Sequence, residues 1–108
     1  MSHIALAQNA LAVLIAPATA NIIGKLAAGI ADDVLTCTVL ATTAPIFIAP
    51  AMNTVMYHNP IVQKNCKKLK DHGYIFIDPI KGQLACGTEG QGHLEEPENI
   101  VKVLKTVI

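Results

Sequence analysis

The 108-residue chain has no arginine, no tryptophan, and only two tyrosines and two phenylalanines. Its eight lysines balance its eight carboxylates, so the formal net charge is zero. A neutral chain without guanidinium groups lacks the basic surface with which proteins bind nucleic-acid phosphates, and this excludes that class of function. The low charge and the 52% apolar composition exclude an intrinsically disordered chain as well.

Long apolar runs and paired cysteines are also missing. No run approaches the roughly 20 apolar residues of a membrane-spanning helix, and no basic segment with an apolar block opens the chain, so we expect neither anchor nor secretory signal. Cys37, Cys66 and Cys86 are widely spaced, without a Cys-x-x-Cys pair. This spacing argues against a disulfide framework or a metal site and for a reducing compartment. We therefore expect one small cytoplasmic domain that holds no metal.

Short apolar runs alternate with helical patterns along the chain. The strand candidates are apolar on both faces, which is typical of a parallel sheet covered by helices on both sides. Alternation of strands and helices indicates an α/β fold with right-handed crossovers. The pattern predicts strands at 12–16, 46–49 and 74–77, helices at about 2–11, 21–30, 32–41, 60–72 and 97–107, and a long glycine-bearing loop at 78–96.

Three strands are few for a parallel sheet. Most sheets have more, and an apolar edge such as the strand at 12–16 invites pairing with another chain. The chain is therefore expected either to oligomerise or to form part of a larger fold.

Two similar segments follow the first two predicted strands: Ala16-Pro-Ala-Thr-Ala-Asn21 and Ala49-Pro-Ala-Met-Asn53. Each ends in asparagine where a helix is expected to begin. Ligands of parallel sheets bind at this edge, where amides and backbone N–H groups can hold a carboxylate or a phosphate. Either asparagine alone could be only a helix cap. Two copies at equivalent positions favour a binding site.

A third candidate is the segment Leu84-Ala-Cys-Gly-Thr-Glu-Gly-Gln-Gly92. Its glycines permit backbone shapes and close approaches that other residues do not. Cys86 is expected to be more accessible here than Cys37 and Cys66, which fall on predicted helix stripes. The alternative is a flexible surface loop with an incidental thiol. His58 and His72 show no metal-ligand spacing and are expected to be structural or surface residues.

Taken in order, four segments resemble the FMN-dependent cysteine decarboxylases, a flavoprotein family. They cover essentially the whole chain. The first is His3-Ile-Ala-Leu6, and the second, Ala16–Asn21, corresponds to the family's Pro-Ala-Ser-Ala-Asn-Thr. The third, Pro50-Ala-Met-Asn-Thr-Val-Met-Tyr57, corresponds to Pro-x-Met-Asn-x-x-Met-Trp, and the fourth is Ala85-Cys-Gly-x-x-Gly-x-Gly92.

The resemblance implies a Rossmann-like parallel sheet with helices on both faces. Residues 1–108 would form an N-terminally truncated domain, the second half of a six-stranded fold, without the family's FMN phosphate loop. The chain departs from the family pattern at three positions. Thr19 replaces serine, Ile22 replaces threonine, and His93 stands where many members have arginine.

The resemblance also implies a function. FMN would be the cofactor, bound between subunits of a homotrimer or higher oligomer. The reaction would be decarboxylation of 4′-phosphopantothenoylcysteine to 4′-phosphopantetheine in coenzyme A biosynthesis, with a fused or separate phosphopantothenoylcysteine synthetase as partner. Decarboxylation of peptide C-terminal cysteines is a related alternative. A non-catalytic fragment or regulatory binding subunit of the same family is the alternative from another class.

Residue roles follow from the resemblance alone. His3 would be the active-site base, and Cys86 would donate a proton in the final reduction. Asn53 would bind the carboxylate that leaves. The other implied contacts are to substrate, by Ala51, Met52 and Met56, and to the flavin, by Pro17, Ala18, Thr19 and Asn21.

Overall fold

The computed structural model describes residues 12–83 and 89–107. The predicted helix at 2–11 lies outside them. In chain order the elements are β1 (Val13–Ala18), α1 (Ala20–Ala28), α2 (Val34–Ala41), β2 (Ile46–Pro50), α3 (Thr54–His58), α4 (Pro60–Asp71), β3 (Ile75–Phe76), β4 (Ile80–Gln83), β5 (Glu89–His93) and α5 (Pro97–Val107).

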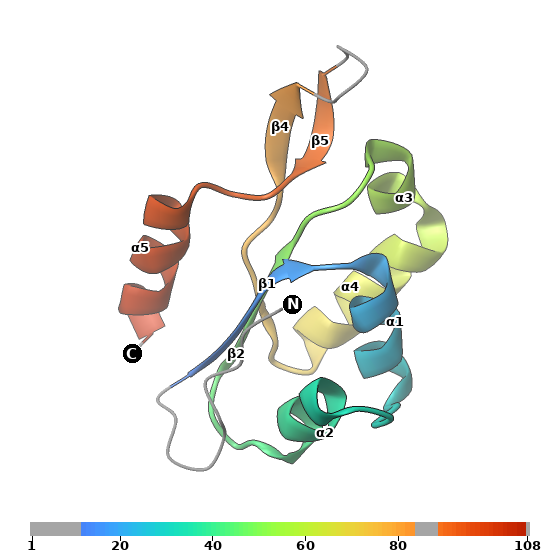
Figure 1. Ribbon diagram of the computed structural model, residues 1–108, viewed down its shortest axis with the longest axis vertical. Helices are drawn as coiled ribbons and strands as arrows, with labels where there is room; N and C mark the ends of the chain where they lie inside the picture. The colour runs from blue at the N-terminus through green and yellow to red at the C-terminus, as the bar shows by residue number, and fades with distance from the viewer. Residues whose placement is uncertain (1–11, 84–88, 108) are drawn as a thin grey trace.

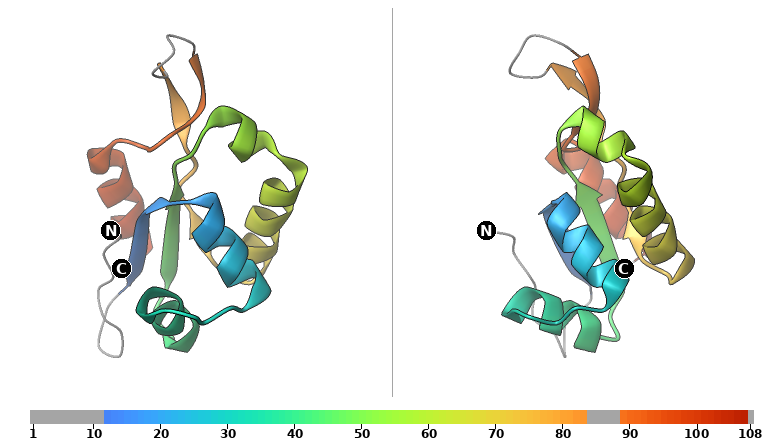
Figure 2. Two further views of the ribbon diagram at one scale, coloured as in Figure 1. Left: turned by 45° about the vertical axis from the view of Figure 1, so that its right-hand side comes forward. Right: turned by 90° about the vertical axis from the view of Figure 1, so that its right-hand side faces the viewer.

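The three predicted strands form one parallel sheet in the order β1-β2-β3, which confirms the α/β fold class. Helices α1, α2 and α4 cover one face of the sheet and α5 covers the other (Figures 1 and 2). None of the described helices is long and apolar enough to cross a membrane.

Alternating side chains along β1 and β2 explain the three layers, because successive residues of a strand point to opposite faces. Val13 and Ile15 belong to the core shared with α1, α2 and α4, whereas Leu14 packs with the α5 side. Phe47 belongs to the α5 side and Ile48 to the other. Both faces are apolar, as expected for a covered parallel sheet.

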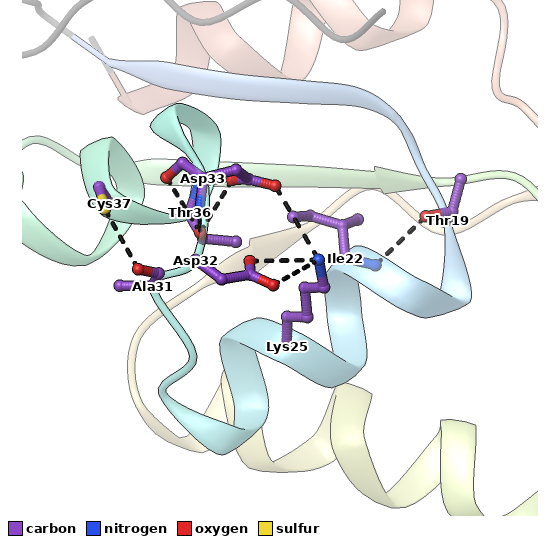
Figure 3. A network of polar contacts seen from close by, with 8 residues as sticks. All are labelled: Thr19, Ile22, Lys25, Ala31, Asp32, Asp33, Thr36 and Cys37. Carbon is purple, nitrogen blue, oxygen red and sulfur yellow. Dashed lines mark hydrogen bonds and ion pairs between the residues drawn. The ribbon is translucent and has the colours of Figure 1, made fainter.

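Polar contacts fix the connection between α1 and α2 (Figure 3). Gly29 ends α1 in the left-handed conformation, with φ of 72°. Lys25 of α1 then reaches across to Asp32, with its Nζ 3.1 Å from the carboxylate. Asp33 and Thr36 form a capping box at the start of α2, in which each side chain accepts a hydrogen bond from the other's backbone N–H.

The prediction of a loop at 78–96 is wrong in part, because β4 and β5 form an antiparallel hairpin within this range. The hairpin projects beyond the sheet beside the short helix α3, which begins after Asn53, where a helix was expected to start (Figure 1). Strand β1 also continues through Pro17. Its register with β2 shifts between Ile15 and Ala18, and proline is tolerated within a strand at such an irregularity.

Some expected buried faces are exposed instead. Helix α2 has no charged residue, so periodicity cannot select its buried face, and Val34 is 75% exposed. Cys37 is exposed too, whereas Cys66 is buried as expected. The sequence pattern placed Val101 on the buried face of α5, but Val101 is exposed, and Val103 packs toward the sheet next to the buried Ile100.

Candidate functional site

Three segments meet at the carboxyl edge of the sheet. They are the end of β1, the turn that follows β2, and the end of β5. The backbone N–H of Ala51 donates to the carbonyl oxygen of Ala18 at 3.1 Å. The next N–H, of Met52, donates to the carbonyl oxygen of Gly92 at 2.9 Å. The two asparagine segments and the glycine segment are therefore neighbours in space.

The β1 segment leads directly into α1. Thr19, not Asn21, caps this helix, because its extended backbone brings its hydroxyl to the N–H of Ile22 at 3.2 Å. Asn21 lies exposed in the first turn. Pro17 is exposed, and the Ala18 side chain is buried, so Ala18 offers backbone rather than side chain to this edge.

Asn53 caps α3, as the sequence suggested. Its Oδ1 accepts hydrogen bonds from the N–H groups of Val55, at 2.8 Å, and of Met56, at 3.3 Å. The residue is exposed, and the oxygen of its amide is thereby engaged. The NH₂ group is the part of this side chain that can donate to a ligand.

The other implied substrate contacts differ in exposure. Met52 is partly buried and packs against the core beneath α1 and α4. Met56 is 48% exposed. Ala51 is half-buried in the turn that follows β2. Tyr57 anchors α3, since it is buried, and burial raises the pKa of its hydroxyl.

Two features of this edge were missed by the sequence reasoning. Gly92 has a φ of 144°, and a Cβ there would lie 2.2 Å from the carbonyl oxygen of Met52. The glycine-rich pattern marked Gly92 as unusual, but its contact is tertiary and has no sequence signal. Thr54 carries a buried hydroxyl that has no hydrogen-bond partner among the described residues.

His3 and Cys86 lie outside the described residues, so their predicted roles stay predictions. His58 and His72 are exposed, and a ring nitrogen of His72 lies 2.8 Å from the carbonyl oxygen of Lys68. Both fit the surface roles expected of them. The buried Cys66 thiol has its pKa raised by burial, and a thiol of this kind is unreactive.

Two hollows of about 410 and 310 Å³ lie at the opposite, amino edge of the sheet. Leu40, His72 and Tyr74 line both of them. Neither is lined by the predicted site residues. We place the candidate site at the carboxyl edge nevertheless, because hydrogen bonds bring the polar loops together there and ligands of parallel sheets bind at that edge.

The chemical character of the edge fits a flavin ring. The segments 16–21 and 49–57 carry no charged side chain, and alanine and proline predominate among the first residues of each. Small apolar residues suit the face of a flat ring, and the hydroxyl and amide groups of Thr19 and Asn21 suit its polar rim.

Comparisons with known proteins identify relatives of this chain. The bifunctional coenzyme A biosynthesis protein CoaBC of Bacillus subtilis is 60% identical over 103 residues, which are 95% of this chain and 25% of that protein. The phosphopantothenoylcysteine decarboxylase of Arabidopsis thaliana is 43% identical over 105 residues, 95% of this chain and 50% of that protein. The chain thus spans half or less of the length of these relatives.

Solved structures show the same fold. A cysteine-to-serine mutant of PPC decarboxylase, in complex with pantothenoylaminoethenethiol, superposes with a TM-score of 0.85 at 41% identity, over 90% of this chain and 54% of that one. The FMN-binding protein AtHal3 gives a TM-score of 0.80 at 42% identity, with 90% and 54% covered. The profile of the family described as Flavoprotein matches residues 1–108. The chain therefore belongs to the flavoprotein family.

Proposed function

We propose that the chain forms the decarboxylase site of an FMN-dependent enzyme that converts 4′-phosphopantothenoylcysteine to 4′-phosphopantetheine in coenzyme A biosynthesis. The observation that carries the proposal is the meeting of the Ala18, Asn53 and Gly92 segments at one edge. The relatives named for this reaction and this pathway support the substrate.

Asn53 would hold the substrate carboxylate. Because the amide oxygen already accepts from the start of α3, the NH₂ group is the part that can donate to a carboxylate oxygen. A neutral donor suits a carboxylate that must leave as carbon dioxide. An ion pair would stabilise the bound ground state more than the transition state, from which charge is departing.

Pro17, Ala18, Thr19 and Asn21 would hold FMN at the end of β1. When bound, FMN supplies the reversible two-electron chemistry at the cysteine-derived part of the substrate. His3 would accept the proton released at the thiol, since an imidazole titrates near neutral pH. Cys86 would return a proton to the carbon skeleton, and Met56 would line the substrate pocket.

The proposal extends to the assembly. FMN would be bound between subunits of a homotrimer or higher oligomer in the cytoplasm. A phosphopantothenoylcysteine synthetase would act beside the decarboxylase, and the description of a relative as a bifunctional coenzyme A biosynthesis protein supports this proposal.

Asn53→Asp tests the proposed function without removing the helix cap. Aspartate caps as well as asparagine, so the fold should persist, but the substitution removes the NH₂ donors and places a negative charge beside the substrate carboxylate. Loss of one such donor costs on the order of 100-fold in turnover. We expect at least this loss when carbon dioxide release is measured with FMN and 4′-phosphopantothenoylcysteine.

Asn59→Asp is the matched control. Asn59 caps α4 through the N–H of Ile61 at 2.8 Å, so the same chemical change is made at a second cap, at the opposite end of α3 from Asn53. This variant should keep wild-type turnover. Equal turnover by the Asn53→Asp variant and the wild type would remove Asn53 from the site.

A further inference from the structure

We propose that Gly92 is a positioning residue, which sets the place of Asn53 through the backbone of Met52. The inference rests on the proposed function, since it concerns how the same edge presents its carboxylate-binding amide. It assigns a specific task to the end of the β4–β5 hairpin.

The first observation is a contact without clearance. The built Cβ position at Gly92 lies 2.2 Å from the Met52 carbonyl oxygen and 3.4 Å from the Thr54 nitrogen. Atoms at 2.2 Å overlap, so this place in the fold has room for hydrogen but not for a methyl group. The turn that carries Asn53 thus occupies the space where a side chain of residue 92 would lie.

The second observation is a hydrogen bond across the same contact. The Met52 N–H donates to the Gly92 carbonyl oxygen at 2.9 Å. Met52 directly precedes Asn53, whose own side chain caps α3, and α3 in turn contacts β5. The asparagine is therefore held from the β5 side both before and after its position in the chain.

The hairpin itself explains only part of the requirement for glycine. The β4–β5 register shifts between Ile80 and Lys81, so that Gly92 is the extra residue of a β-bulge. A bulge can demand the positive φ, and bulges recur next to active sites, where they redirect neighbouring groups. A bulge alone does not require that the turn carrying Met52 fill the space beside the α-carbon of Gly92.

Gly92→Ala should therefore act on Asn53. To relieve the overlap the Met52 carbonyl must move by about 0.8 Å or more, and a misplacement of about 1 Å at a site can cost on the order of 100-fold. Because the Asn53 amide acts on the carboxylate as it leaves, the loss should fall on kcat. We expect kcat for 4′-phosphopantothenoylcysteine to fall at least about tenfold while KM changes less than about threefold.

Gly73→Ala is the control for backbone strain. Gly73 also has a positive φ, 94°, but a Cβ there would meet nothing within 4 Å. Both variants bear a strained alanine, and only the Gly92 variant also bears the overlap. FMN affinity, followed by quenching of flavin fluorescence, should be equal in the wild type and in both variants.

The outcomes separate the two proposals. If the wild type does not decarboxylate the substrate, the proposed function fails and this inference fails with it. If the wild type is active and Gly92→Ala shows the kinetics of Gly73→Ala, only the positioning role is overturned. A rise in KM at unchanged kcat would overturn it as well.

A measurement on the wild-type chain covers the case in which Gly92→Ala does not fold. Met52 lies outside every helix and strand, yet its amide should exchange with deuterium more slowly than an unprotected amide by on the order of 100-fold, because it is bonded to Gly92. Exchange at the rate of a free amide would show that β5 does not hold the turn.

Discussion

At the scale of single residues, Asp33 offers a test of the fold by pH. The backbone N–H and then the hydroxyl of Thr36 stabilise the carboxylate and lower the pKa of Asp33 below its ordinary value of 3.8. A carboxyl group whose pKa is lowered by folding stabilises the protein above its unfolded pKa. That contribution is lost as the pH falls through the folded pKa.

Asp33→Asn should make the stability less sensitive to acid. Asparagine caps a helix about as well but does not titrate, so the variant should lose less stability than the wild type between about pH 6 and pH 3. Thermal unfolding of both proteins over this range gives the comparison. Parallel curves would mean that the capping box does not hold the Asp33 carboxylate.

Local sequence patterns predicted the structural roles of some single residues and missed those of others. Asn53 was found because a polar residue after a strand and before a helix is a local pattern. Thr19 was overlooked as the cap of α1, since Asn21 two positions later is an equally plausible cap by type. The fit of Gly92 against Met52 joins residues 40 positions apart, and no local pattern contains it.

At the scale of elements, the glycine inside α1 and the glycine that caps its C-terminus should respond oppositely to alanine. Gly29 ends the helix at a φ of 72°, where alanine is strained by about 1 kcal/mol. Gly24 lies inside the helix, and a Cβ there would be in ordinary contact with the Asn65 amide at 3.7 Å. Gly24→Ala should therefore raise stability by about 0.5–1 kcal/mol.

Chemical denaturation of the two variants and the wild type measures both effects. The opposite signs serve as the internal control, because each variant adds one methyl group to the same helix. A Gly29→Ala variant as stable as the wild type would contradict the strained cap.

Elements with a strong period were predicted well and the others were not. Helix α4 follows its pattern, with Cys66 and Leu69 buried and its lysines exposed. The hairpin was missed because the sequences of β4 (Ile-Lys-Gly-Gln) and β5 (Glu-Gly-Gln-Gly-His) contain too few apolar residues to alternate. Asn53 marked the start of helix α3, but the five residues of this helix are too few for a period to show its extent.

At the scale of the whole molecule, the proposed assembly is open to direct measurement. Native mass spectrometry should give multiples of three of the 11.4 kDa protomer, with about one FMN per protomer and the absorbance of a bound flavin. A monomer that stays colourless after incubation with FMN would favour the non-catalytic alternative and contradict the shared flavin site.

The overall architecture was predictable because apolar strands alternating with amphipathic helices leave few topologies. The parallel pairing of the strands and the coverage of both faces agree with that expectation. What the sequence could not supply was the junction of loops at the carboxyl edge, since that junction depends on two backbone hydrogen bonds between distant segments.

Those two bonds arise from successive amides, Ala51 to one side and Met52 to the other. Their consequence concerns chain length. If one residue were inserted or deleted between Pro50 and Asn53, a different backbone amide would face the carbonyl oxygens of Ala18 and Gly92. The Asn53 side chain would then turn away from the edge, even if every other side chain were kept. The spacing of this turn, more than its composition, is what a redesign of the protein has to leave intact.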